Sequence, residues 1–261
     1  MTPLFFGSNE RRLYGVWHPS DRPSPAPAVL FCQPLGQEYV RCHRMTRTLA
    51  VRLARQGRCS LRFDYAGTGD SAGADEDASL SGWIEDVVTA HDEVRRRAGT
   101  DRVIWLGVRL GAVAALLAAA KVAVRPVGLV LWEPIGTGAA YLADLAIRHG
   151  EALTASYTLV PSGLPAGDRD ELLGFGLGEE MRRELSELVL ERRLDGAVLP
   201  PSTWILPASP PAYVATPATE LGATTRRFDH PFEWNAEESL NSALVPAEAV
   251  NLLLDACLSF T

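Results

Sequence analysis

Positive charge is scarce in this sequence. Its 261 residues include 25 lysines and arginines against 32 aspartates and glutamates, which gives a formal net charge of −7 at pH 7. A nucleic-acid-binding protein needs a basic surface to neutralise phosphates. The acidic balance therefore argues against nucleic acid as a partner.

Cysteine is also scarce, and its spacing carries no known pattern. The four cysteines are Cys32, Cys42, Cys59 and Cys257, with no Cys-x-x-Cys pair and no histidine at a zinc-ligand interval. Neither a disulfide framework nor a metal site is indicated. We expect buried, reduced thiols, no metal and no cofactor.

Long apolar runs are missing. No stretch approaches the ~20 apolar residues that span a bilayer. The first twenty residues, which are polar at 7–12, lack the pattern of a signal peptide. We therefore expect a cytoplasmic protein with no membrane partner.

Apolar residues are nevertheless abundant. They make up 47% of the chain, enough for a sizeable core. A chain of this length lies near the upper limit for one hydrophobic core, so one domain is expected.

The chain alternates between apolar strand patterns and helical patterns. Strands are expected at 4–6, 12–18, 28–32, 59–63, 103–106, 127–132, 203–208 and 224–229, and helices at 39–56, 80–97, 112–122 and about 247–260. Apolar runs without polar alternation, separated by helices, are typical of parallel strands covered on both faces. The sequence thus predicts an α/β protein with a doubly wound, mostly parallel sheet.

The alternation stops between Gly136 and Pro200. The pattern there is helical, with an amphipathic stretch at 179–194 whose apolar residues recur every three or four positions. We expect residues 136–200 to form a helical cap over a core built from 1–135 and 201–261.

Several motifs of this chain occur together, and in the same order, in one known superfamily. The sequence resembles the α/β-hydrolases, on the serine-aminopeptidase-like branch near the exosortase-associated hydrolases. The resemblance rests on LFCQPLGQEYVRCHR (30–44), LRFDYAGTGDSAG (61–73), GVRLGAVAA (107–115), LVLWEP (129–134) and ELLGFGLGEEMRREL (171–185). It implies an α/β-hydrolase fold with a cap but does not settle the chemistry, since one fold supports many activities.

An arginine occupies the position where these hydrolases carry their nucleophile. An apolar strand, a Gly107-x-x-x-Gly111 turn and an Ala/Leu-rich helix have the pattern of a nucleophile elbow, and its central residue is Arg109. A guanidinium stays protonated and has no available lone pair, so it serves as neither nucleophile nor base. An acyl-serine intermediate is therefore not expected at this turn.

The one literal Gly-x-Ser-x-Gly of the sequence lies elsewhere, at Gly69–Gly73. It precedes no apolar helix, and the resemblance implies that this loop is a structural turn. We therefore do not expect Ser71 to be a nucleophile, and we expect Asp64 to bind backbone amides.

Two interpretations of Arg109 remain open. It forms an internal ion pair with Glu133, which follows the next strand, or with Glu38; or it binds a carboxylate or phosphate group of a substrate through bidentate hydrogen bonds. We start from the substrate interpretation. It predicts that loss of the guanidinium weakens ligand binding more than stability.

The remaining triad positions are only partly filled. His230 follows the last expected strand, beside Pro231 and Phe232, where the superfamily keeps its histidine. The loop after 203–208 offers only Glu220 as an acid. Glu133 is therefore the expected partner of His230, in a pair that could move a proton.

These residues lead to one preferred function and one alternative. The preferred function is an atypical hydrolase-fold enzyme that acts on a carbonyl-containing small molecule or peptide with an anionic group, by water-mediated hydrolysis, epimerisation or cyclisation in biosynthetic tailoring. Glu133 and His230 would be catalytic, and the substrate-binding set would be Arg109, Gln33, Leu35, Gly36, Glu38, Val108 and Leu110. The loop at 33–36 would stabilise charge on a carbonyl oxygen. The alternative is a non-catalytic binding or partner protein, and the oligomeric state stays open.

Overall fold

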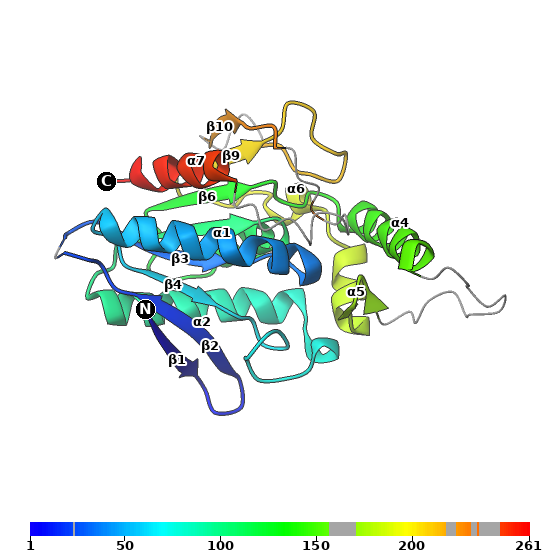
Figure 1. Ribbon diagram of the computed structural model, residues 1–261, viewed down its shortest axis with the longest axis horizontal. Coiled ribbons are helices and arrows are strands. Elements are labelled where there is room, and N and C mark those ends of the chain that lie inside the picture. The colour runs from blue at the N-terminus through cyan, green and yellow to red at the C-terminus, as the bar shows by residue number, and fades with distance from the viewer. Residues whose placement is uncertain (23, 157–170, 218–222, 231–233, 235–245) are drawn as a thin grey trace.

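The computed structural model describes residues 1–22, 24–156, 171–217, 223–230, 234 and 246–261. Its central feature is an eight-stranded sheet in the order β1-β2-β4-β3-β5-β6-β9-β10 (Figure 1). The strands are β1 (Thr2–Gly7), β2 (Arg12–His18), β3 (Ala28–Cys32), β4 (Ser60–Phe63), β5 (Val103–Val108), β6 (Gly128–Trp132), β9 (Ser202–Leu206) and β10 (Ala223–Arg227). In this sheet β1 pairs with β2, and β2 with β4, in antiparallel fashion, and the other neighbouring strands pair in parallel. The predicted doubly wound, mostly parallel sheet is therefore confirmed.

Helices cover both faces of this sheet. Helices α1 (Gly36–Arg55) and α7 (Ala247–Leu258) pack on one face, and α2 (Leu80–Ala98) and α3 (Leu110–Ala119) pack on the other (Figure 1). Every residue of α3 is buried, which explains a helix composed almost entirely of alanine, leucine and valine. Strands β3, β5 and β6 are buried along their whole length, as expected for parallel strands between two helical layers.

The described residues between β6 and β9, 133–156 and 171–201, lie beyond the carboxyl ends of the strands for the most part (Figure 1). They contain α4 (Gly138–Ser156), β7 (Glu171–Leu172), β8 (Phe175–Gly176), a short helix α5 (Glu179–Ser186) and one turn of helix, α6 (Leu190–Arg193). The purely helical pattern predicted for 136–200 is wrong in one place, because β7 and β8 form a hairpin. Its two turn residues, Leu173 and Gly174, both have positive φ, which is the geometry of a tight two-residue hairpin turn.

The amphipathic stretch at 179–194 is also interrupted. Val189 forms an isolated antiparallel bridge with Thr137, and the amide of Leu190 donates to the carbonyl of Gly136 at 2.8 Å. These contacts pull the backbone between α5 and α6 out of helical geometry. The periodic apolar residues Met181, Leu185 and Leu188 are still buried.

All four cysteines are free thiols; Cys32, Cys42 and Cys257 are buried as expected, whereas the expectation is wrong for Cys59, which is only half-buried. Burial raises the pKa of the Cys32 thiol far above its usual range. The described residues contain no group of three or more His, Cys, Asp or Glu side chains that could hold a metal ion. Across the same described ranges, no helix combines the length and apolarity required to cross a bilayer.

A buried histidine makes stability sensitive to acid. His18 accepts a hydrogen bond from Nε of the buried Arg62 at 3.2 Å, and burial together with the Arg62 charge lowers the pKa of His18 to about 4 from 6.5. Between these values the unfolded chain binds a proton that the folded chain does not. Stability should therefore be full above about pH 6.5 and fall as the pH drops toward 4.

We expect His18→Gln to remove this part of the pH dependence. The glutamine keeps an acceptor for Arg62 but does not titrate, so wild type should lose about 2–3 kcal/mol more than the variant between pH 7 and pH 4. Urea titrations at several pH values measure the difference. Parallel pH profiles for the two proteins would contradict the prediction.

Candidate functional site

The turn from β5 to α3 has the backbone of a nucleophile elbow. Arg109 has φ +54° and ψ −119°, a conformation that non-glycine residues rarely adopt. Two glycines allow the tight turn. A Cβ on Gly111 would lie 2.2 Å from the carbonyl oxygen of Gln33, and one on Gly107 would lie 2.5 Å from Cα of Ala112.

Sheet register brings Arg109 and Glu133 side by side. The parallel pairing of β5 and β6 matches Val108 with Trp132, so the residues that follow them leave adjacent strands at the same edge. Glu133 also has a positive φ, of +46°. Both side chains of the pair therefore rest on strained backbone at the carboxyl end of the sheet.

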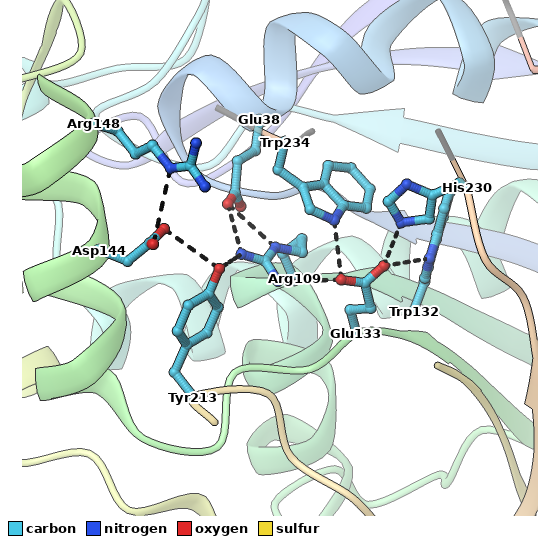
Figure 2. Close-up of polar contacts among 9 residues, drawn as sticks. All are labelled: Glu38, Arg109, Trp132, Glu133, Asp144, Arg148, Tyr213, His230 and Trp234. Carbon is cyan, nitrogen blue, oxygen red and sulfur yellow. Dashed lines mark hydrogen bonds and ion pairs between the residues drawn. The ribbon is translucent and has the colours of Figure 1, made fainter. Parts of the chain in front are cut away.

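Arg109 is enclosed by two carboxylates. Its Nε and Nη2 donate to Oε1 of Glu38 at 3.2 and 3.0 Å, and its Nη1 donates to Oε2 of Glu133 at 3.5 Å (Figure 2). The side chains of Arg109 and Glu38 are 0% and 1% exposed. The guanidinium, which the elbow places over the sheet, is thus neutralised inside the protein.

Glu133 is the centre of a second set of hydrogen bonds. His230 Nε2 lies 2.6 Å from its Oε1, and the indole nitrogens of Trp132 and Trp234 donate to Oε1 and Oε2, each at 3.1 Å (Figure 2). Burial by itself opposes the charge of this carboxyl. The hydrogen bond with His230 and the charge of Arg109 outweigh it and hold the pKa of Glu133 below its usual value.

Aromatic rings complete the enclosure of the guanidinium. The centre of the guanidinium lies 5.3 to 5.5 Å from the ring centroids of Tyr141, Tyr213 and Trp234. Burial opposes the cation, but the charge of Glu38 contributes most to raising the pKa of Arg109 above its already high value. These three rings could not be predicted from the sequence, because they come from α4 and from two loops without a recognisable spacing.

The polar contacts continue beyond Arg109. Its Nη2 donates to the hydroxyl of Tyr213 at 3.4 Å, and that hydroxyl donates to Asp144 at 3.4 Å (Figure 2). Asp144 lies 3.9 Å from Nε of Arg148 on the same helix. The network thus connects the elbow with α4.

This geometry is that of the internal ion pair, and it includes both carboxylates named as possible partners. The hydrogen bonds of Arg109 described above go to Glu38, Glu133 and Tyr213. A substrate anion would have to displace a buried carboxylate in order to reach the guanidinium. At the elbow turn Arg109 is flanked by Val108 and Leu110, both packed in the core.

A cavity of about 250 Å³ lies beside the elbow, and Arg109, Glu133 and His230 do not line it. Its walls come from the loops after β3 and β4, the first turns of α1, the short 3₁₀ turn at Asp75–Asp77 and the hairpin β7–β8. Gln33, Leu35 and Gly36 line it, as the sequence analysis expected of a ligand-binding loop. Glu38, Val108 and Leu110 do not line it.

The loop with the literal Gly-x-Ser-x-Gly has a structural role. Ser71 Oγ donates to the carbonyl of Asp64 at 2.5 Å and accepts from the amide of Tyr14 at 2.8 Å. Asp64 accepts from the amide of Asp70 at 3.1 Å, and also from the hydroxyl of Tyr39 at 2.6 Å. Ser71 is therefore occupied in holding the turn. Glu220, Pro231 and Phe232 lie outside the described residues.

Comparison with known structures identifies the fold. Est1E from Butyrivibrio proteoclasticus, solved with ferulic acid, has a TM-score of 0.62 at 18% identity, over 98% of this chain and 99% of its own. A proline iminopeptidase of Mycobacterium smegmatis has a TM-score of 0.63 at 13% identity, over 99% and 98%. The enol-lactonase of Burkholderia xenovorans LB400 has a TM-score of 0.57 at 15% identity, over 98% and 99%. At these identities the likeness shows the α/β-hydrolase fold alone.

Sequence comparison identifies the family. No curated protein matches the chain significantly. The profile of the S33 serine aminopeptidases matches residues 24–167, more than half of the chain, including the elbow and the loops that follow β3 and β4. This match supports a hydrolase-type function, and it shows that the chain belongs to the serine aminopeptidase family S33.

Proposed function

We propose that this chain is a hydrolase-fold protein that binds a small organic molecule in the cavity beside the 33–36 loop and forms no covalent intermediate at its elbow. One observation carries the proposal. The elbow is filled by a buried Arg–Glu network, whereas the cavity lies beside it and has different walls. In this proposal the former catalytic centre supports the structure, and the loop at 33–36 contacts the ligand.

The walls of the cavity favour ligand binding. They are mainly apolar, with Leu35, Val40, Phe63, Phe175 and Leu177 among them. Pockets for small molecules typically combine such walls with a few polar groups that orient the ligand. Gln33 is 1% exposed, and neither polar atom of its amide has a hydrogen-bond partner among the described residues. A buried amide of this kind is a candidate polar group for a ligand.

A cavity-blocking variant tests where ligands bind. Val40 lines the cavity and is 51% exposed, so Val40→Trp should obstruct the cavity without disturbing the core. Val51→Trp is the control, since Val51 is also exposed on α1, at 39%, but does not line the cavity. We expect compounds that raise the Tm of wild type and Val51→Trp to lose this effect on Val40→Trp. Stabilisation that persists in Val40→Trp would overturn the proposal.

A covalent probe tests the chemistry at the elbow. A fluorophosphonate forms a covalent adduct with an activated serine. Because the elbow carries Arg109 in place of a serine, we expect no such adduct in the intact mass of the protein. We also expect any weak hydrolysis of aryl esters to be the same in wild type and Ser71→Ala. A stoichiometric adduct on a serine, or ester hydrolysis that disappears in Ser71→Ala, would show that the chain retains a serine nucleophile.

The pair Glu133–His230, at 2.6 Å, favours a second candidate function. An acid and a histidine in contact can transfer a proton, so water-mediated hydrolysis or epimerisation of a carbonyl compound is a possible chemistry of this site. In that case Arg109 would orient an anionic group after displacement of Glu38 or Glu133. Turnover that is lost in His230→Gln but retained in Val40→Trp would support this function over ligand binding in the cavity.

A further inference from the structure

The described residues that line the cavity beside the 33–36 loop carry charge of one sign. They include two carboxylates, Asp64 and Asp75, and, within the part of the chain that the structure describes, no lysine, arginine or histidine. Arg109 does not line the cavity, and its charge is neutralised by the ion pairs with Glu38 and Glu133. Among the described residues that line the cavity, an anionic ligand would thus meet two carboxylates and no cationic side chain.

Asp64 is well placed to accept a further hydrogen bond. It is almost fully buried, with one bond to each carboxylate oxygen, from the hydroxyl of Tyr39 at 2.6 Å and from the amide of Asp70 at 3.1 Å. A carboxylate offers about four acceptor sites, so both oxygens keep capacity. Arg62, the guanidinium that interacts electrostatically with Asp64, donates to His18 and does not line the cavity.

Aromatic residues line the same cavity as these two carboxylates. Tyr39, Phe63, Tyr65 and Phe175 all line the cavity, and Phe175 reaches it from the hairpin β7–β8. The faces of aromatic rings attract cations, and sites for organic ammonium ions often combine such rings with an acidic group. The rings also offer apolar surface to the rest of a ligand.

We propose that the cavity binds a small organic cation, an amine with an aliphatic or aromatic body, whose ammonium group lies near Asp64 and whose apolar part contacts the rings of Phe63 and Phe175. This inference rests on the proposed function, because it names the ligand class of the same cavity. It differs from the anionic ligand that an arginine at the elbow suggests. The charge preference comes from the cavity walls, and Arg109 takes no part in it.

Three probes of similar size and different charge test the inference. They are phenethylamine, 2-phenylethanol and 3-phenylpropanoate, which at pH 7 are a cation, a neutral molecule and an anion. We expect calorimetry to show phenethylamine binding at least about tenfold more tightly than 3-phenylpropanoate, with 2-phenylethanol between them. Added salt should weaken the binding of the amine and not that of the alcohol.

Two variants identify the charges responsible. Asp64→Asn removes the buried charge and should bring the Kd of phenethylamine close to that of 2-phenylethanol. Since Asp64 also holds its loop, Asp75→Asn provides a second test at an exposed position, where an amide oxygen can still accept from Gly176. We expect Asp75→Asn to weaken amine binding by a smaller factor and to leave alcohol binding unchanged.

The outcomes separate this inference from the proposed function. Equal or tighter binding of 3-phenylpropanoate, or no binding of any probe at millimolar concentration, would overturn the cation inference. If probes bind with that inverted order and Val40→Trp abolishes their binding, the ligand class is wrong and the proposed cavity function stands. If phenethylamine binds equally well to Val40→Trp, the ligand lies elsewhere and both proposals fail.

Discussion

Replacing Arg109 with methionine is expected to lower the free energy of unfolding by about 3–5 kcal/mol, because it leaves buried carboxylates without their cation. Glu38 loses two charge-assisted hydrogen bonds and Glu133 loses a third contact. Methionine fills part of the space but cannot donate. Denaturant titrations of wild type and variant at pH 7 measure the loss.

Further variants show whether the loss of stability comes from buried carboxylates left without a cation. Arg109→Met with Glu38→Gln should recover much of it, and adding Glu133→Gln should recover more, since residues in one network are not additive. Arg183→Met is the matched control. Arg183 also contacts two carboxylates, Glu180 and Glu187, but lies in solvent, so its replacement should change stability little.

A different result would restore the substrate interpretation of this arginine. If Arg109→Met is nearly as stable as wild type but no longer binds an anionic ligand, the guanidinium exchanges its internal partners for a substrate. The second candidate function, with Glu133 and His230 as proton-transfer residues, would then be favoured.

Gly111→Ala is expected to destabilise the protein by about 3 kcal/mol or more, because the added methyl group meets backbone that cannot move aside. Its Cβ would lie 2.2 Å from the carbonyl oxygen of Gln33 and 2.3 Å from that of Cys32. To relieve this clash, α3 would have to move away from β3, and that movement would disrupt the buried packing around the elbow. Thermal and denaturant unfolding measure the effect.

Gly150→Ala is the control for this substitution. Gly150 lies within α4, and a Cβ there meets no atom within 4 Å. Alanine should raise stability by about 0.5–1 kcal/mol, since glycine is a poor helix former. Similar effects of the two substitutions would show that the close approach at Gly111 is not rigid.

Local pattern was sufficient to predict most of the sheet. The strands at 12–18 and 28–32 have the predicted limits, because apolar and aromatic residues predominate in both segments and favour strands. Two helices begin earlier than predicted, α1 at Gly36 and α3 at Leu110, and both also end earlier, at Arg55 and Ala119. The first turns of these helices form against the loops after β3 and β5. The spacing of apolar residues in the sequence does not reveal such tertiary contacts.

The hairpin at 171–176 escaped prediction for a related reason. Each of its strands has two residues, too few to show an alternating pattern. The position of the hairpin depends on tertiary contacts. One of them is the close approach of the Phe175 side chain to Gly36, where a larger residue would have its Cβ. Short strands of this kind are stabilised by their tertiary neighbours more than by intrinsic propensity.

The sequence by itself determined that Arg109 makes no nucleophilic attack at the elbow. Its guanidinium stays protonated and has no lone pair with which to attack a carbonyl, whatever the fold. The sequence also determined the candidate acids, Glu38 and Glu133, from their positions after β3 and β6. Only the tertiary structure decided that both carboxylates reach Arg109 at once, that three aromatic rings enclose it, and that the mainly apolar cavity beside the elbow has two carboxylates in its walls. The physical reason is that each of these properties depends on distances between side chains from separate elements, which are set by the sheet register and by the packing of α1, α4 and the hairpin β7–β8.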